Sequence, residues 1–322
     1  MDCPRSALAR LWHNRTLRTI VVVAFIGLVS YFLYQYARDI EWHRVWLALL
    51  AIPPTTIAEA SAVTAGGYLA YAALDLLSQR YTGHKLPRTA VTGIAMLSYA
   101  LNLNLGVLIG GLGTRLRLYS RMGCDKEVPA SVTLFSGLSN WIGFCWLGGI
   151  LFLTVSVPLP PAAAEGASAL RIAGGVLLLA AAGYSVICLR HAGSSRMLSG
   201  ILFKLPTFRM ALAQGAVAAL SWALMGLTLH LLLQGRVPYV AVLGILLYSG
   251  VAALVTRIPG GLGTTEALFV AALAGQVPPF ETLGAVLAYR AVYFVMPLML
   301  SLVAFAATEA GLAWRHHRAA SR

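Results

Sequence analysis

The chain has 322 residues, of which 59% are hydrophobic and 11% are charged, and its mean hydropathy is +0.77. This composition is too apolar for a soluble protein and too poor in charge for a disordered one, so we expect an integral membrane protein. The net charge of +13 would suggest nucleic-acid binding in a soluble protein, but the basic residues here fall in short segments between apolar runs. That distribution is typical of cytoplasmic loops facing anionic lipid, and we expect no nucleic-acid partner.

Residues 1–54 are predicted to form an N-terminal anchor helix and an interfacial segment. Four arginines precede the apolar run 19–37, which at about 1.5 Å per residue is long enough to cross a bilayer once. No small-x-small cleavage site precedes Arg38, so we expect a retained anchor with a cytoplasmic N-terminus. Trp42 and Trp46 follow as interfacial anchors.

Five further runs are apolar and long enough to cross a membrane. Cytoplasmic loops are rich in Lys and Arg, so the positions of the basic residues set the direction of each crossing. Together with the first run they predict about six spanning helices, and they place both termini and most of the 24 Lys and Arg in the cytoplasm. The five runs are approximately residues 55–77, 130–157, 170–189, 210–233 and 282–307.

Two other apolar stretches do not fit a full crossing. Residues 89–109 lead directly into a cluster of basic residues, which would lie outside if that stretch crossed. Residues 239–274 begin and end beside turns with few basic residues. We therefore predict two re-entrant hairpins, the first entered from the cytoplasm and the second from the outside.

The first hairpin is expected to turn at Asn102 and Asn104 and to leave the membrane through the glycines that follow. Asn102 either satisfies the interrupted backbone or contacts a ligand. Arg115 and Arg117 come after the glycines, near the cytoplasmic face. There they either bind an anionic headgroup or only set the topology.

The second hairpin contains the sequence Arg257-Ile258-Pro259-Gly260-Gly261-Leu262-Gly263-Thr264-Thr265-Glu266. Proline removes a backbone donor and glycine relaxes a helix, so the backbone is expected to break here. A break in hydrocarbon is tolerated only inside protein or beside water, and intramembrane charges mark functional sites. The alternative is a helix-capping turn at the membrane surface.

A short sequence repeat relates the two hairpins. Gly110-Gly111-Leu112-Gly113-Thr114 recurs as Gly260-Gly261-Leu262-Gly263-Thr264, and each copy comes before a full span. Because the two hairpins are entered from opposite sides, the fold class that we predict is an all-α polytopic integral membrane protein with an inverted-topology repeat. The single transmembrane domain divides into repeat 1 (55–157), a connecting helix and cytoplasmic loop (158–209), repeat 2 (210–308) and a basic cytoplasmic tail (309–322).

A buried arginine in the last span is the strongest candidate for a binding residue. Arg290 lies close to the bilayer centre and must pair, either with Glu266 in a structural bridge or with a lipid phosphate, whose geometry a guanidinium matches bidentately. Tyr293, one turn later, either packs or contacts the same ligand. The predicted lipid-binding residues are Arg290, Glu266, Arg257, Arg115, Arg117, Tyr293 and Asn102, with the hairpin glycines Gly110, Gly111, Gly113, Gly260, Gly261 and Gly263.

Signals of enzymatic chemistry are sparse. The four cysteines have no metal-ligand spacing, there is no nucleophile elbow, and neither glycine motif precedes a Lys-Ser/Thr pair as in a phosphate-binding loop. We therefore expect no catalytic residue, no metal and no cofactor.

Several passages together resemble the YbhN-like bacterial inner membrane proteins, within the lysylphosphatidylglycerol synthase transmembrane-region family. In larger members this region precedes a soluble aminoacyl transferase domain and is linked to moving the modified lipid across the membrane. The catalytic domain is absent from these residues, so the resemblance implies a lipid translocase-like unit without lipid aminoacylation, and it does not carry over a substrate. The matching passages are Leu74-Asp75-Leu76-Leu77; Gly83-His84-Lys85-Leu86; Tyr99 to Asn102; Gly110 to Gly113 with Arg115, Arg117, Leu118, Tyr119, Ser120 and Arg121; Ile258-Pro259 with Gly261, Gly263 and Glu266; and Tyr289-Arg290 with Tyr293 and Pro297.

We expect a multi-pass protein of the bacterial inner membrane that binds and transports an anionic lipid or lipid-linked molecule at a midplane site. The alternative is a non-transporting membrane scaffold or regulator of envelope lipid synthesis, with lipid-synthesis enzymes as partners; a third reading is a lipid transferase with a buried site. The lipid, the energy coupling and the oligomeric state stay open.

Overall fold

The computed structural model describes residues 41–159, 166–198, 201–256 and 261–307. The chain divides into two compact units, Met1–Arg44 and Val45–Arg322, and the helix packing described below lies in the second. The predicted N-terminal anchor, the basic tail, Arg257 and Gly260 lie outside the described residues. A short helix, α3 (Trp42–Leu50), contains the two tryptophans predicted as interfacial anchors, Trp42 and Trp46, and both are exposed.

Five described helices are long and apolar enough to cross a membrane. They correspond to five of the six predicted spans, and the chain is a polytopic α-helical membrane protein. The last of the five is composite, because the π-helix η4 (Arg290–Val295) interrupts it after α12 (Pro279–Tyr289). The five spans are α4 (Pro54–Thr82), α7 (Glu127–Thr154), Ser168–Arg190 within α8 (Ala167–Arg190), α9 (Phe208–Leu232) and Pro279–Ala307.

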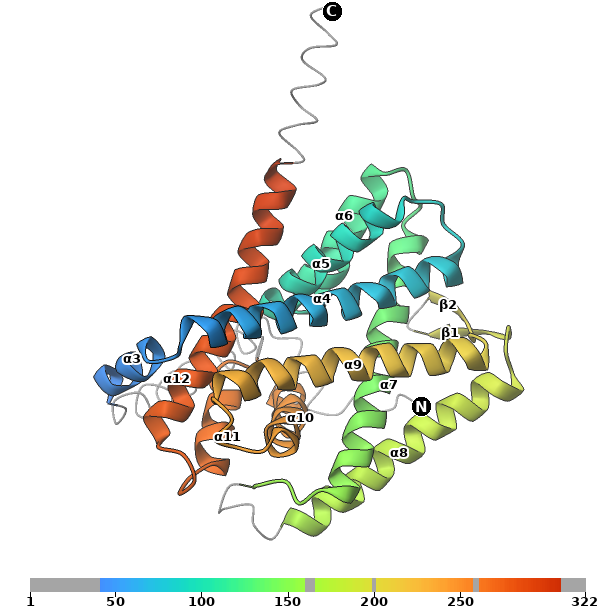
Figure 1. Cartoon of the computed structure of the whole chain (residues 1–322). Coiled ribbons are helices and arrows are strands. Elements are labelled where there is room, and N and C mark those ends of the chain that lie inside the picture. Colours follow the sequence, from blue (N-terminus) through green and yellow to red (C-terminus); the bar gives the residue numbers. More distant parts are fainter. Residues whose placement is uncertain (1–40, 160–165, 199–200, 257–260, 308–322) are drawn as a thin grey trace, which may run out of the picture. The chain divides into compact units, whose positions relative to one another are not determined.

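Helices α4 and α9 lie side by side, and α7 packs against both α8 and α9 (Figure 1). Small and hydroxyl side chains make these contacts, as expected where lipid removes the hydrophobic drive for helix association. The hydroxyl oxygens of Thr64 in α4 and Thr228 in α9 are 3.3 Å apart. Ser221 of α9 donates a hydrogen bond of 3.3 Å to the carbonyl of Gly67 in α4. These contacts hold the two helices together at the centre of the second unit.

The first predicted hairpin is a pair of helical segments with a chain reversal between them. Helix α5 (Arg88–Leu105) ends at Gly106, whose φ of +83° favours glycine, and η1 (Val107–Gly113) and α6 (Thr114–Arg121) follow. Gly110 then lies against α5 so closely that an added Cβ would be 2.2 Å from the carbonyl carbon of Leu101. The reversal therefore comes at Gly106, just after the asparagines at which the turn was expected, and the glycine segment that follows is π-helical.

The second hairpin consists of α10 (Tyr239–Thr256) and α11 (Thr264–Ala272), which pack against each other. Gly261 and Gly263 both have positive φ, at +60° and +80°. Among the described residues, Gly261 to Gly263 lie outside α-helix, as the sequence predicts, and a short helix begins directly after them.

A small β-hairpin departs from the predicted all-α fold. Strands β1 (Ser195–Leu198) and β2 (Ile201–Lys204) pair antiparallel in the connection where we expected only a loop. The backbone N–H of Lys204 donates to the hydroxyl of Tyr81 at the end of α4, at 2.7 Å. This bond fixes the β-hairpin beside that end of α4.

Candidate functional site

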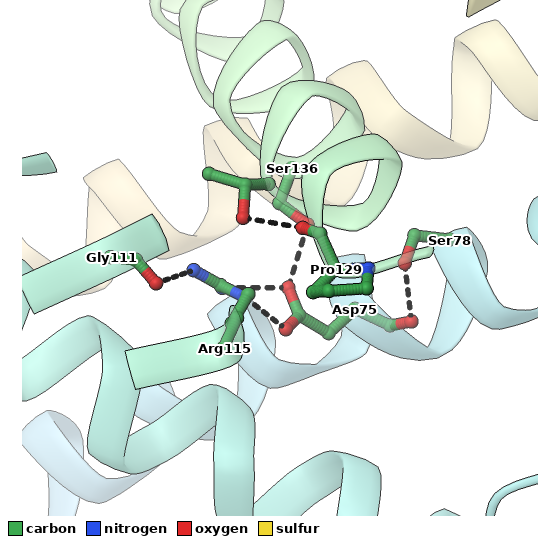
Figure 2. A network of polar contacts seen from close by, with 7 residues as sticks. Asp75, Ser78, Gly111, Arg115, Pro129 and Ser136 are labelled. Atoms are coloured by element: carbon green, nitrogen blue, oxygen red, sulfur yellow. Dashed lines mark hydrogen bonds and ion pairs between the residues drawn. The ribbon is translucent and has the colours of Figure 1, made fainter. Parts of the chain in front are cut away.

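A buried ion pair joins the first hairpin to α4 (Figure 2). The guanidinium of Arg115 donates from Nε to one oxygen of Asp75 at 2.9 Å and from Nη2 to the other at 3.0 Å. Ser136 of α7 donates to the same carboxylate at 2.6 Å. Both charged residues are almost completely buried, Asp75 at 0% exposed and Arg115 at 2%. A bidentate pair with an extra hydroxyl donor is the geometry that offsets the cost of removing two charges from water.

This pair specifies two positions that the sequence left open. Asp75 lies in the protein interior, within the predicted span 55–77. Arg115 lies between α4 and α7, where it pairs with a carboxylate. Burial lowers the pKa of the neighbouring imidazole of His84, although the charge of Asp75 opposes this shift. The histidine is therefore neutral at pH 7, and Arg115 provides the positive charge that pairs with Asp75.

A second ion pair joins the second hairpin to the last span. Arg290 at the start of η4 donates from Nε to Glu266 at 2.8 Å and from Nη2 at 3.4 Å. The backbone N–H of Gly263 donates to the same carboxylate at 2.8 Å, and the guanidinium lies 4.7 Å from the ring centroid of Phe294. Arg290 and Glu266 are 9% and 8% exposed. The pairing considered from the sequence is thus present.

Both ion pairs have a further contact of the same kind. Arg115 donates to the carbonyl of Gly111 at 3.3 Å, and Arg290 donates to the carbonyl of Gly261 at 2.9 Å. Gly111 and Gly261 are the same position of the repeated Gly-Gly-Leu-Gly-Thr sequence. Each arginine therefore binds both a carboxylate and the backbone of a glycine segment, although Arg115 lies in the first hairpin itself and Arg290 lies in the last span.

A group of tyrosines from α4, α5 and the last span packs around η4. Tyr68 donates to the carbonyl of Tyr293 at 3.0 Å, and the hydroxyls of Tyr99 and Tyr293 are 3.5 Å apart. Asn104, whose amide also donates to the carbonyl of Ala100 at 2.8 Å, donates to the carbonyl of Phe294 at 3.3 Å. Two carbonyls of the π-helix thus accept hydrogen bonds from side chains of α4 and α5.

A cavity of about 290 Å³ lies between the two hairpins, and both guanidinium-bearing residues line it. Asp75 and Glu266 are not among its described lining residues, so each carboxylate lies behind its arginine as seen from the cavity. Several aromatic residues form much of the remaining wall. They are Tyr71, Tyr99, Trp141, Trp222, Tyr289 and Phe294.

The structure brings some of the predicted site residues together and separates others. Asn102 lines the cavity beside Arg115 and Arg290. Arg117 is exposed, and neither it nor the fully buried Tyr293 is among the residues that line the cavity. Among the predicted glycines, Gly111 and Gly261 line the cavity. Gly110 and Gly263 shape the hairpins, and the added Cβ of Gly113 would meet only a carbonyl oxygen at 3.4 Å.

The residues that sequence reasoning missed include Asp75 as the partner of Arg115, and Asn140 and Thr265 as lining residues. Signals were available for Asp75 and Asn140. A lone carboxylate in an apolar span needs a partner, and Asn140 lies halfway along a spanning helix. In the described part of the chain, no three His, Cys, Asp or Glu side chains come together as metal ligands would.

One protein family and two individual proteins are similar to this chain over nearly its whole length. The family model described as "Lysylphosphatidylglycerol synthase TM region" matches residues 17–301. The inner membrane protein YbhN of Escherichia coli (strain K12) is 35% identical over 296 residues, which is 92% of this chain and 93% of that protein. A protein of Synechocystis sp. (strain ATCC 27184 / PCC 6803 / Kazusa), named uncharacterized protein slr0712, is 30% identical over 289 residues, which is 88% of each chain.

Proposed function

The chain belongs to the family of lysylphosphatidylglycerol synthase transmembrane regions, and on this premise we propose that it binds an anionic phospholipid or lipid-linked molecule in the central cavity and moves it across the bacterial inner membrane. The name of the Escherichia coli relative supports the choice of membrane. The proposed activity moves the lipid without modifying it, and the protein is not an enzyme in this proposal.

The observation that carries the proposal is the position of the two arginines. Arg115 and Arg290 line one cavity within apolar helices, and each has its carboxylate partner behind it. A guanidinium matches the geometry of a phosphate through two parallel N–H donors. Removal of the headgroup from water is costly, and the two cations with the surrounding polar lining would offset that cost.

We further propose that the two hairpins enter the membrane from opposite faces, as parts of an inverted-topology repeat. The cavity lining supports this symmetry, because several lining residues occur as pairs separated by 150 positions. Each such pair has one member in residues 55–157 and the other in residues 210–308. The pairs are Tyr99 and Ser249, Leu103 and Ala253, Gly111 and Gly261, Arg115 and Thr265, and Asn140 and Arg290.

In the mechanism that we propose, the carboxylates hold the arginines when no lipid is bound. An entering phosphate takes over part of the hydrogen bonding of Arg115 or Arg290, which weakens the attachment of that hairpin to its spanning helix. Arg115 attaches the first hairpin to α4, and Arg290 attaches the second hairpin to the last span, so the exchange would loosen one hairpin at a time. Alternating release of two such hairpins would open the cavity to each side of the membrane in turn.

The test is lipid movement by the purified full chain in liposomes that contain fluorescent phosphatidylglycerol or cardiolipin. Arg290→Gln keeps a polar side chain but removes the charge and the two parallel N–H donors. A charge-assisted hydrogen bond contributes about 1.5–3 kcal/mol. We therefore expect the transport rate to fall by about 10- to 100-fold. The rate is measured from the loss of fluorescence when a membrane-impermeant quencher reaches the transported lipid.

Arg117→Gln is the matched control, because this arginine is exposed and is not among the lining residues of the cavity. It should transport at the rate of the unchanged protein. Equal rates for the unchanged protein, Arg290→Gln and empty liposomes would contradict transport. Lipid binding without movement would instead favour the non-transporting scaffold or regulator.

A further inference from the structure

Uncharged hydrogen-bonding side chains also line the cavity. Asn140 of α7 lies at the middle of a spanning helix, and Thr265 lies in the first turn of α11. Within the described ranges, neither side chain has a hydrogen-bond partner. The polar atoms of both side chains keep some exposure to solvent. A polar group at this depth without a protein partner is costly unless water or a bound molecule satisfies it.

The position of these residues relative to the arginines is informative. Asn140 precedes Arg290 by 150 positions, and Thr265 follows Arg115 by 150 positions. All four residues line the cavity. In each of these two pairs, one member has a guanidinium and the other has a neutral group that both donates and accepts hydrogen bonds. Through these pairs, each half of the chain therefore contributes one guanidinium and one neutral group to the cavity.

We infer that Asn140 and Thr265 form a subsite for hydroxyl groups of the headgroup whose phosphate the arginines bind. The inference rests on the proposed function and specifies its substrate class, which is a phosphodiester whose alcohol carries free hydroxyls. A hydroxyl group both donates and accepts, as do the Asn140 amide and the Thr265 hydroxyl. Asn140 and Thr265 are thus specificity-determining residues.

The charges around the cavity favour the same class of headgroup. No described lining residue is Asp or Glu, and two are Arg. An ammonium group in the cavity would be a donor-only cation beside two guanidinium groups, without a carboxylate directly in contact with it. A headgroup of phosphate and hydroxyls has no such repulsion, so phosphatidylglycerol should bind better than phosphatidylethanolamine.

The experiment measures binding of three lipids with identical acyl chains to the full chain in detergent micelles: phosphatidylglycerol, phosphatidic acid and phosphatidylethanolamine. Phosphatidic acid has the phosphate but no alcohol. Thr265→Val and Asn140→Leu remove the hydrogen bonds with little change in volume, and a neutral hydrogen bond contributes about 0.5–1.5 kcal/mol. Each variant should weaken phosphatidylglycerol binding by about 3- to 10-fold and leave phosphatidic acid binding unchanged.

Thr133→Val is the matched control for Thr265→Val. Thr133 also lines the cavity, but its hydroxyl donates to the carbonyl of Pro129 at 2.7 Å (Figure 2 labels Pro129). This variant should leave the ratio of phosphatidylglycerol affinity to phosphatidic acid affinity unchanged. An equal loss of both lipids, or no loss of phosphatidylglycerol, in Asn140→Leu and Thr265→Val would overturn the hydroxyl subsite and leave the proposed function standing.

Two other outcomes separate the inference from its premise. If neither anionic lipid binds the unchanged protein, the proposed function itself is wrong, and the subsite falls with it. Soluble glycerophosphoglycerol is added as a competitor to identify the source of the headgroup. Glycerophosphoglycerol binding as tight as phosphatidylglycerol binding, with an equal loss of affinity in Thr265→Val, would support the subsite. It would contradict the conclusion that the natural ligand of the subsite is a lipid.

Discussion

Replacing Asp75 with alanine is expected to lower the free energy of unfolding by about 3–5 kcal/mol, because it leaves the guanidinium of Arg115 buried without a counter-charge. Arg115 is only 2% exposed, so contact with solvent does little to replace the lost carboxylate. Ser136 would lose its acceptor as well. The measurement is equilibrium unfolding of the full chain in mixed micelles, followed by tryptophan fluorescence.

Two further variants show whether the loss comes from the unpaired charge. The double variant Asp75→Leu with Arg115→Met removes both charges and should recover most of the lost stability, since buried pairs are often replaceable by apolar residues. Glu41→Ala breaks a pair with Arg44 whose side chains are 63% and 59% exposed, and it should change the free energy by less than about 1 kcal/mol. A small effect of Asp75→Ala, similar to that of Glu41→Ala, would contradict the buried pair.

Replacing Gly110 with alanine is expected to prevent the first hairpin from closing. The added Cβ would lie 2.2 Å from both the carbonyl carbon and the carbonyl oxygen of Leu101, and 2.5 Å from the nitrogen of Asn102. These are main-chain atoms, so no side-chain rotation relieves the overlap, and we expect a loss of about 3 kcal/mol or more. The same unfolding measurement and the yield of monodisperse protein test this expectation.

Gly93→Ala provides the control within the same hairpin. Gly93 lies inside α5, and an added Cβ would meet nothing within 4 Å. Because alanine favours helix over glycine by about 1 kcal/mol, this variant should be as stable as the unchanged protein or slightly more stable. If Gly110→Ala behaved like Gly93→Ala, the close packing of η1 on α5 would be wrong.

Several features of the fold follow directly from the sequence, because long apolar runs and helix-breaking residues act locally. The five described spans coincide with predicted runs, and helical backbone is interrupted at Gly106, just after the asparagines of the first hairpin, and at Gly261 and Gly263 in the second. The pairing of Arg290 with Glu266 was one of the two alternatives predicted, because a charge at that depth needs a partner. These inferences needed only the length, charge and composition of single segments.

The rest of the site depends on contacts between segments far apart in the chain. The pairing of Asp75 with Arg115 requires α5 and α6 to fold back against α4, and the exposure of Arg117 requires a particular rotation of α6. The lining role of Asn140 depends on which face of α7 meets the cavity. Tyr293 also lies outside the cavity lining because the π-helix changes which side chains share a face. Periodicity along one segment contains none of this information.

The π-helix of the last span links the winding of that helix to the position of the first hairpin. Widening a helical turn releases carbonyls from their usual partners, and here the carbonyls of Tyr293 and Phe294 accept hydrogen bonds from Tyr68 and Asn104. If α5 moved away, Phe294 would lose its external donor, and a tighter turn would become the better way to satisfy its carbonyl. Rewinding by one residue rotates everything that follows by about 100°. A shift of the first hairpin, which is far from this helix in the sequence, would then rotate the end of the helix that we assign to the cytoplasm.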